Sequence, residues 1–169
     1  MLANEEDYVN NPNDVGGETN HGVTTATARS QGVKGPMSAM TQDFAFEVYW
    51  RRYVIAPGFD QIATVSMPIA AELVDAGVNM GPDVATVSLQ RSLNGLNNGA
   101  RDYPDLTIDG AVGTATLAAL KAFLARRGAT GERRLLPLLN ALQGERYLSL
   151  TEDRAGHEAF LYGWLARAA

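Results

Sequence analysis

The residues of this 169-residue chain whose types and spacing favour chemistry are concentrated between Glu5 and Thr24, in the run EEDYVNNPNDVGGETNHGVT. Acidic side chains open the run, a Pro/Asn/Asp-rich stretch and a glycine pair follow, and small and polar residues come last. The pattern predicts a helix end carrying a glutamate, a turn, and a short β-hairpin over residues 19–24. Because so polar a run is not core material, we expect it to form one wall of a cleft.

Two carboxylates in this run, Glu5 and Asp14, are nine positions apart. A pair of carboxyl groups across a cleft is what glycosidic bond cleavage requires, because one protonates the leaving oxygen while the other aligns water or stabilises an oxocarbenium-like centre. Glu6 lies beside Glu5, and its negative charge would raise the pKa of a proton donor. Either glutamate can be the acid, and Asp14 either acts in catalysis or only stabilises its turn.

The order of residues in the run resembles the signature E-G-G-Y-V-N-D-P-x-D-x-G-G-x-T-N-x-G-I-T of the glycoside hydrolase 108 N-acetylmuramidases. This lysozyme-like family includes phage endolysins and proteins once called secretion activators. The chain departs from the signature at Glu6 and Asp7, where the family has two glycines, and at Asn11, where it has an aspartate. The matching positions are Glu5, Tyr8, Val9, Asn10, Pro12, Asp14, Gly16, Gly17, Thr19, Asn20, Gly22 and Thr24.

The resemblance implies a lysozyme-type enzyme that cleaves the β-1,4 bond between N-acetylmuramic acid and N-acetylglucosamine, with Glu5 as the general acid. The spacing from Glu5 to Asp14 also resembles phage-type lysozymes, which implies that Asp14 is a base or an electrostatic support. Thr19 and Asn20 are then expected to hold a water against the far face of the sugar. That arrangement implies inversion with carboxyl groups about 6.5–9.5 Å apart, whereas about 5 Å would indicate a retaining route.

A non-catalytic protein that binds peptidoglycan or takes part in secretion, and that has kept the fold, is the alternative to an enzyme. Two features of the sequence suggest this non-catalytic alternative: the motif begins E-E-D, and only four residues precede Glu5, where the family has a helix. An amidase or peptidase is a third reading. A zinc amidase is not favoured, because HEAFL at His157 lacks the second histidine of H-E-x-x-H.

Further side chains are expected to bind the sugar chain. A helix that Thr41 can cap is rich in aromatic rings, which either stack on sugars or pack in the core, and the family resemblance includes an aromatic pair there. The run from Asp75, DAGVNMG, resembles a D-x-x-V-N-x-G run in the family's cleft floor, although Asp75 could equally bond a neighbouring backbone group. The expected substrate-binding residues are Tyr8, His21, Thr24, Tyr49, Trp50, Tyr53, Asp75 and Asn79.

The elements that must position these residues are mainly helices. The sequence predicts a mainly α, lysozyme-like helical fold with a short β-hairpin near the N-terminus. A short helix and then a loop are expected over residues 25–41. Longer helices are expected after Thr41, from Met67-Pro68, from Gly81-Pro82, from Thr114 to Gly128, over residues 135–150 and over residues 157–167.

Two regions are expected: a muramidase region over residues 1–93 and a helical, peptidoglycan-binding-like region over residues 94–169. In the pattern D-G-x-x-G-x-x-T, Asp109-Gly110 should form a tight turn, and Gly113 should adopt a backbone angle closed to other residues. The pattern resembles the turn of small peptidoglycan-binding helical modules. No Ser/Gly/Pro-rich spacer separates the regions, so we expect them to pack together.

Composition limits the classes of partner. The hydrophobic content of 46% supports a buried core, and the net charge of −5 argues against nucleic acid, because phosphate binding needs clustered Lys and Arg. The basic residues between Lys121 and Arg134 are typical of a solvated helix end, although they could also meet anionic envelope polymers. The absence of cysteine excludes disulfides and thiolate zinc sites, and no metal or cofactor is expected.

We expect a monomer whose partner is bacterial peptidoglycan. The first residues do not have the pattern of a signal peptide, and no apolar segment approaches the roughly 20 residues that span a bilayer. The protein is therefore expected to be made in a host cytoplasm and to reach the cell wall, in the periplasm or outside, only after release.

Overall fold

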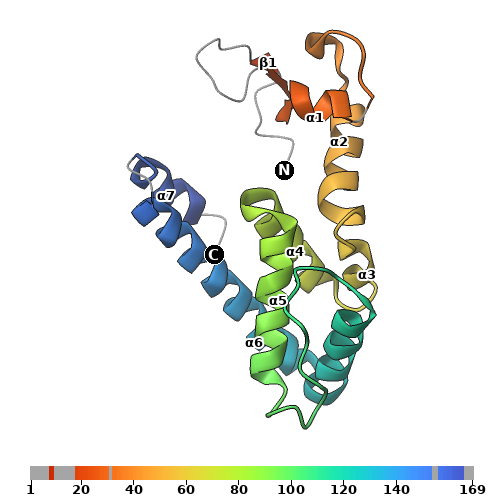
Figure 1. Ribbon diagram of the computed structural model, residues 1–169, viewed down its shortest axis with the longest axis vertical. Coiled ribbons are helices and arrows are strands. Elements are labelled where there is room, and N and C mark those ends of the chain that lie inside the picture. The colour runs from red at the N-terminus through yellow and green to blue at the C-terminus, as the bar shows by residue number, and fades with distance from the viewer. Residues whose placement is uncertain (1–7, 10–17, 31, 154–155, 166–169) are drawn as a thin grey trace. The chain divides into compact units, whose positions relative to one another are not determined.

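The computed structural model describes residues 8–9, 18–30, 32–153 and 156–165 (Figure 1). The chain is mainly α with a short antiparallel hairpin near the N-terminus, which confirms the predicted fold class. It divides into two compact units, residues 1–54 and residues 55–169, and each has an apolar core of its own.

The first unit begins with a small antiparallel sheet of three strands in the order β1 (Tyr8–Val9), β2 (Thr19–Asn20) and β3 (Val23–Thr24). Strands β2 and β3 form the predicted hairpin, and the two residues between them, His21 and Gly22, have φ angles of 47° and 73°. Two consecutive positive φ angles give a turn whose twist matches that of a hairpin. The pairing of β1 with β2 was not predicted from the sequence.

The helices of the first unit are α1 (Thr25–Ser30), the 3-10 turn η2 (Met37–Ala39), α2 (Gln42–Trp50) and the π-helical stretch η3 (Arg51–Ile55), whose last residue already belongs to the second unit. Helix α2 begins as predicted, because the Thr41 hydroxyl accepts a hydrogen bond from the Phe44 N–H at 3.3 Å. The buried residues that join hairpin, turn and helix into one core are Val23, Ala28, Met37, Met40, Ala45 and Val48.

The second unit begins with α3 (Phe59–Ala63), α4 (Met67–Met80) and α5 (Pro82–Leu96). Pro68 lies in the first turn of α4, as predicted, and the Ser66 hydroxyl caps that helix by accepting from the Ile69 N–H at 3.2 Å. Gly81 separates α4 from α5 with a φ of 99°, which a residue with a side chain rarely adopts. The predicted restart at Gly81-Pro82 is therefore confirmed.

Helix α6 (Thr114–Asp153) is two helical segments joined at Gly128, whose φ of 56° and ψ of −153° are not helical. The predicted end at Gly128 is confirmed. The predicted start of the next helix at residue 135 is wrong, because the chain is helical again directly after Gly128 and continues through Pro137. The last helix, α7 (Glu158–Leu165), packs on α6 through the ring of Trp164, which lies 5.6 Å from that of Tyr147.

The loop between α5 and α6 is fixed by Gln90, which is buried. Its Oε1 accepts from the N–H groups of Asp109 and Gly110, and its Nε2 donates to the Asp109 carboxylate at 2.8 Å. The tight turn predicted at Asp109-Gly110 is present, but the positive φ angle lies at Gly110 (73°) and not at Gly113. The Gly113 prediction is wrong because the Asp109 side chain already closes the turn by accepting from the Ala111 N–H.

One continuous core holds the second unit together, and α6 lies against both α4 and α5 (Figure 1). Its largest members come from α3, α4, α5 and α6, so none of these helices has a core of its own. Within the described residues no helix is both long and apolar enough to cross a membrane. The fully buried large side chains of this core are Phe59, Ile62, Ile69, Leu73, Leu89, Leu93, Leu120 and Leu135.

Candidate functional site

The hairpin of the first unit is fastened to α2 at its turn. The Tyr49 hydroxyl donates a hydrogen bond of 2.9 Å to the carbonyl oxygen of Gly22, and Val23 packs in the core close by. Tyr49 therefore holds the hairpin in position and also contributes to the surface of the site.

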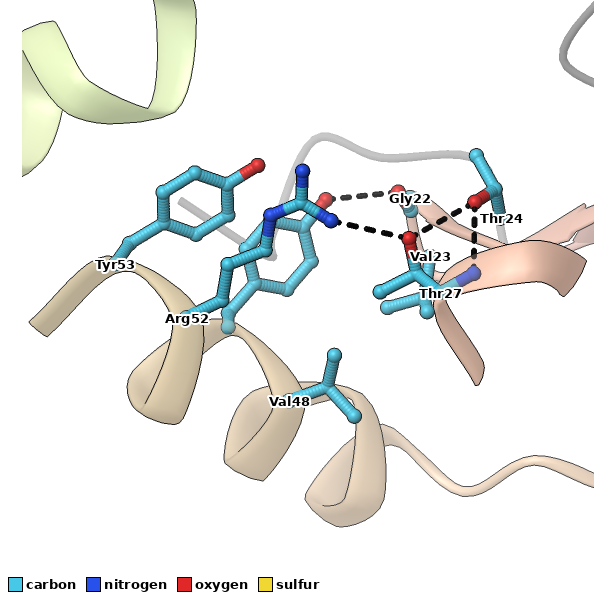
Figure 2. A pocket seen from close by; sticks show the side chains of 8 residues that line it. Gly22, Val23, Thr24, Thr27, Val48, Arg52 and Tyr53 are labelled. Carbon is cyan, nitrogen blue, oxygen red and sulfur yellow. Dashed lines mark hydrogen bonds between the residues drawn. The ribbon is translucent and has the colours of Figure 1, made fainter. Parts of the chain in front are cut away.

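A pocket of about 220 Å³ lies between the hairpin and α1 on one side and α2 and η3 on the other (Figure 2). Three of the predicted substrate-binding residues, Thr24, Tyr49 and Tyr53, line this one pocket. The residues that line it are Gly22, Val23, Thr24, Thr27, Val48, Tyr49, Arg52 and Tyr53.

A chain of hydrogen bonds crosses the pocket from α1 to η3 (Figure 2). The Arg52 guanidinium donates to the Thr27 hydroxyl at 3.2 Å, and the Thr24 hydroxyl donates to the same oxygen at 3.0 Å. Thr24 in turn accepts from the Thr27 N–H at 3.3 Å, as a residue just before a helix commonly does. Arg52 and Thr27 were not predicted from the sequence, because 25 residues separate them and neither type stands out alone.

Aromatic rings form the other part of the wall. The rings of Tyr49 and Tyr53 stack with their centroids 5.6 Å apart, and the Arg52 guanidinium lies 5.4 Å from the centroid of the Tyr53 ring. Tyr53 and Arg52 stand on the π-helical stretch η3, a rare geometry that is frequent at functional sites. The wall thus combines an apolar stacking face with a cation.

The structure does not bring Trp50 to this pocket. Trp50 stacks on Phe46, with ring centroids 6.0 Å apart, and 47% of its surface is exposed. His21 occupies the first position of the hairpin turn and is half-buried.

The two residues of β2 have different surroundings. Asn20 is buried, and its Nδ2 donates to the carbonyl oxygens of Met37 at 2.6 Å and Met40 at 3.4 Å. Its Oδ1 has no hydrogen-bond partner in the part of the chain that the structure describes. Thr19 is half-buried and pairs with Thr24 across the hairpin. Successive strand residues point to opposite faces, so Thr19 and Asn20 face different sides of the sheet.

Asp75 and Asn79 stand on α4 in the second unit. The Asn79 amide donates to the Asp75 carbonyl oxygen at 2.8 Å, and the Asp75 carboxylate accepts from Gln143 of α6 at 3.2 Å. Burial, and then the charge of Asp75, raises the pKa of the nearby Glu72 carboxyl above its ordinary value. The bond between Asp75 and Gln143 joins α4 to α6.

The remaining predicted residues cannot be placed in the site. Glu5 and Asp14 lie outside the described residues, as does Glu6, and Tyr8 is described only as part of strand β1. Among the residues that are described, no group of three His, Cys, Asp or Glu side chains is arranged to hold a metal ion.

Comparisons with known proteins match the chain in two parts. Residues 1–81 match the family Glycosyl hydrolase 108, and residues 84–169 match the family Predicted Peptidoglycan domain. No match is found among curated proteins. A solved structure described as that of Brucella abortus SagA shares the fold, with a TM-score of 0.67 and 24% sequence identity over 99% of this chain and 84% of that chain.

Residues 1–81 belong to the glycosyl hydrolase 108 family, and residues 84–169 form a peptidoglycan domain. The family makes the protein a glycosidase, and the two matched regions together make it a hydrolase of peptidoglycan.

Proposed function

We propose that the protein is an N-acetylmuramidase of the lysozyme type, which cleaves the β-1,4 bond between N-acetylmuramic acid and N-acetylglucosamine. The observation that carries the proposal is the match of the first 81 residues to the glycoside hydrolase family, with Glu5 at the position of the acid in the signature that the run resembles. The pocket beside the hairpin supports it, because it offers sugar-binding chemistry next to the same run.

In this proposal Glu5 protonates the glycosidic oxygen as its bond to the anomeric carbon breaks. Asp14 accepts a proton from the attacking water, whose oxygen bonds to the anomeric carbon from the opposite face. The sugar configuration is then inverted. If Asp14 instead supports the positive charge that develops on the ring, its carboxylate stabilises the transition state without accepting a proton.

Thr19 and Asn20 take different parts in this proposal. Thr19 is the residue of β2 that holds the water, because its hydroxyl group lies on the less buried face of the sheet. Asn20 holds β2 against the loop that ends at Met40, since its amide nitrogen is already bonded to carbonyl oxygens. Its contribution to catalysis is to position the strand.

The pocket is proposed to hold a sugar ring against the Tyr53 face, with hydroxyl groups of the sugar bonded to Thr24. Aromatic faces and hydroxyls are the groups with which pyranose rings are commonly bound. The other expected contacts to the glycan chain are assigned to Tyr8, His21, Tyr49, Trp50, Asp75 and Asn79, as members of further subsites.

The test is the identity of the new reducing end. The purified protein is incubated with peptidoglycan, the products are reduced with borohydride, and the reduced sugar is identified after hydrolysis. We expect reduced muramic acid to accumulate in proportion to loss of turbidity. Reduced glucosamine would mean that the other glycosidic bond is cut, and release of amines without reducing ends would mean an amidase or peptidase.

We further propose that the protein is a bacteriolytic phage endolysin, and a separate assay addresses this role. Added from outside to bacteria with permeabilised outer membranes, the protein is expected to lyse them at a rate that follows its muramidase activity. Cleavage of purified peptidoglycan without lysis of any cells would contradict the bacteriolytic role only.

A further inference from the structure

Arg52 is an exposed arginine that forms no ion pair with any carboxylate in the part of the chain that the structure describes. Its neighbour Arg51, by contrast, reaches the Glu47 carboxylate at 3.8 Å and does not line the pocket. The two arginines differ in partner and in position although they are adjacent in the chain.

The Arg52 side chain is nevertheless held in place. One guanidinium nitrogen donates to the Thr27 hydroxyl, and the guanidinium lies over the Tyr53 ring, which is a favourable position for a cation. A guanidinium has five N–H donors in a rigid fork. Most of these donors therefore remain available for a ligand in the pocket.

The Thr27 hydroxyl adds a donor to the same place. Its oxygen already accepts hydrogen bonds from Arg52 and from Thr24, so both lone pairs are occupied. What the hydroxyl can still do is donate its own proton. The Arg52 guanidinium and the Thr27 hydroxyl can both only donate hydrogen bonds to a ligand. The ligand that fits them is therefore one that accepts hydrogen bonds and carries a negative charge, such as an anionic oxygen.

We propose that Arg52 and Thr27 bind a carboxylate of the cell-wall polymer and so make the pocket selective for peptidoglycan over neutral N-acetylglucosamine polymers. This inference rests on the proposed function, because it assigns the pocket to the glycan that the enzyme cuts. Peptidoglycan carries carboxylates in two places: on the lactyl group of muramic acid where no peptide is attached, and on the stem peptides. Arg–carboxylate pairs are frequently bidentate, which fixes the orientation of the ligand as well as its position.

Three polymers separate these sources: intact peptidoglycan, glycan strands freed of peptides, and the same peptide-free strands with their carboxylates converted to neutral amides. Binding of the full-length protein to each polymer is measured first, and KM and kcat are then taken from reducing-end release. The variants are Arg52→Gln, which removes the charge, Arg52→Lys, which keeps the charge but loses the fork, and Thr27→Val. Arg51→Gln is the matched control.

We expect Arg52→Gln to weaken binding and raise KM about tenfold on a carboxylate-bearing polymer, the scale of one hydrogen bond to a charged group, with kcat little changed. Arg52→Lys and Thr27→Val should show smaller losses, and Arg51→Gln none. Amidated strands should bind the parent and Arg52→Gln equally. A loss that is present on peptide-free strands assigns the carboxylate to the lactyl group, whereas a loss on intact peptidoglycan alone assigns it to the stem peptide.

Two results would overturn the inference. One is equal behaviour of Arg52→Gln and Arg51→Gln on every polymer; the other is an equal loss for Arg52→Gln on amidated strands. Failure of the proposed function is distinguishable from both, because a parent protein that releases no reducing ends can still show carboxylate-dependent binding through Arg52. Thermal unfolding of each variant verifies that the substitutions leave the fold intact.

Discussion

Asn20 and Arg52 show how neighbours decide what a polar residue does. From the sequence, Asn20 was expected to act on water because of its place in the motif, but its amide nitrogen bonds the backbone of the loop at Met37. Arg52 drew no functional prediction, yet its guanidinium lines the pocket. The sequence shows the types of these two residues but not their hydrogen-bond partners, which lie 17 residues from Asn20 and 25 residues from Arg52.

At this scale the first prediction concerns Asp14. Replacing it with Asn removes the base or the supporting charge while keeping the size of the side chain, so turnover should fall at least about 10²-fold with little change in Tm. Reducing-end release and thermal unfolding are measured on the same preparation. A variant that cuts peptidoglycan at the parent rate but melts earlier would assign Asp14 to the turn alone.

At the scale of elements, local chemistry predicted most helix ends. Thr41, Pro68, the Gly81-Pro82 pair and Gly128 each act through groups within a few residues, so sequence reading sufficed. Strand β1 was missed because two residues are too few to show the alternation of apolar and polar side chains that marks a strand. It is defined only by its pairing with β2. The π-helical stretch η3 was missed for a similar reason, since no residue pattern distinguishes it from an α-helix.

The hairpin should depend on its fastening to α2. Tyr49→Phe removes the hydroxyl that donates to Gly22 and leaves that carbonyl without this partner, so we expect a loss of about 1 kcal/mol in the free energy of unfolding. Tyr53→Phe is the control, because it keeps the stacked ring pair. Chemical denaturation of both variants measures the difference. Equal stability of the two would show that the Tyr49 bond does not fasten the turn.

The junction of α4 and α6 should respond to pH through Glu72. Its pKa in the folded protein is raised above 4.5 by burial first and by Asp75 second, so the folded state holds this proton more tightly than the unfolded state. The contribution to stability is fully present below about pH 4.5 and is lost as pH rises through the folded pKa. Glu72→Gln, which stays neutral, should therefore melt above the parent at pH 7 and close to it at pH 4.

The measurement is the difference in melting temperature between Glu72→Gln and the parent protein, taken at pH 7 and at pH 4. A difference that stays constant with pH would show that titration of Glu72 does not contribute, and a parent that melts above the variant only at neutral pH would show the opposite sign. Asp83→Asn, on the exposed surface of α5, is the control for loss of a negative charge.

At the scale of the whole molecule, the boundary between the matched families does not coincide with a boundary between cores. The first family ends at residue 81 and the second begins at residue 84, yet α4, which precedes that boundary, shares its core with α5 and α6, which follow it. The expected division at residue 93 placed α5 with the preceding helices and α6 with the other region. The division at residue 93 stays a prediction about which residues serve which function, and it does not describe how the apolar cores are divided.

The shared core predicts how fragments behave. Residues 55–169 should fold alone and unfold cooperatively, whereas residues 84–169 should not, because the latter lack Ile69 and Leu73 of α4. Each fully buried large aliphatic side chain contributes about 1.5–3 kcal/mol, and a domain is stable by only about 5–15 kcal/mol. Circular dichroism melting of the two fragments measures this. A sharp transition in residues 84–169 alone would contradict a core shared across the family boundary.

The most direct test of a glycosidase centred on Glu5 compares Glu5→Gln with Glu6→Gln in reducing-end release from peptidoglycan. The two variants lose the same charge and the same proton at adjacent positions, so each is the control for the other. We expect Glu5→Gln to abolish turnover while it still binds peptidoglycan and unfolds near the parent temperature, and Glu6→Gln to keep substantial activity. A Glu5→Gln protein that releases reducing ends at the parent rate would contradict the assignment of the acid.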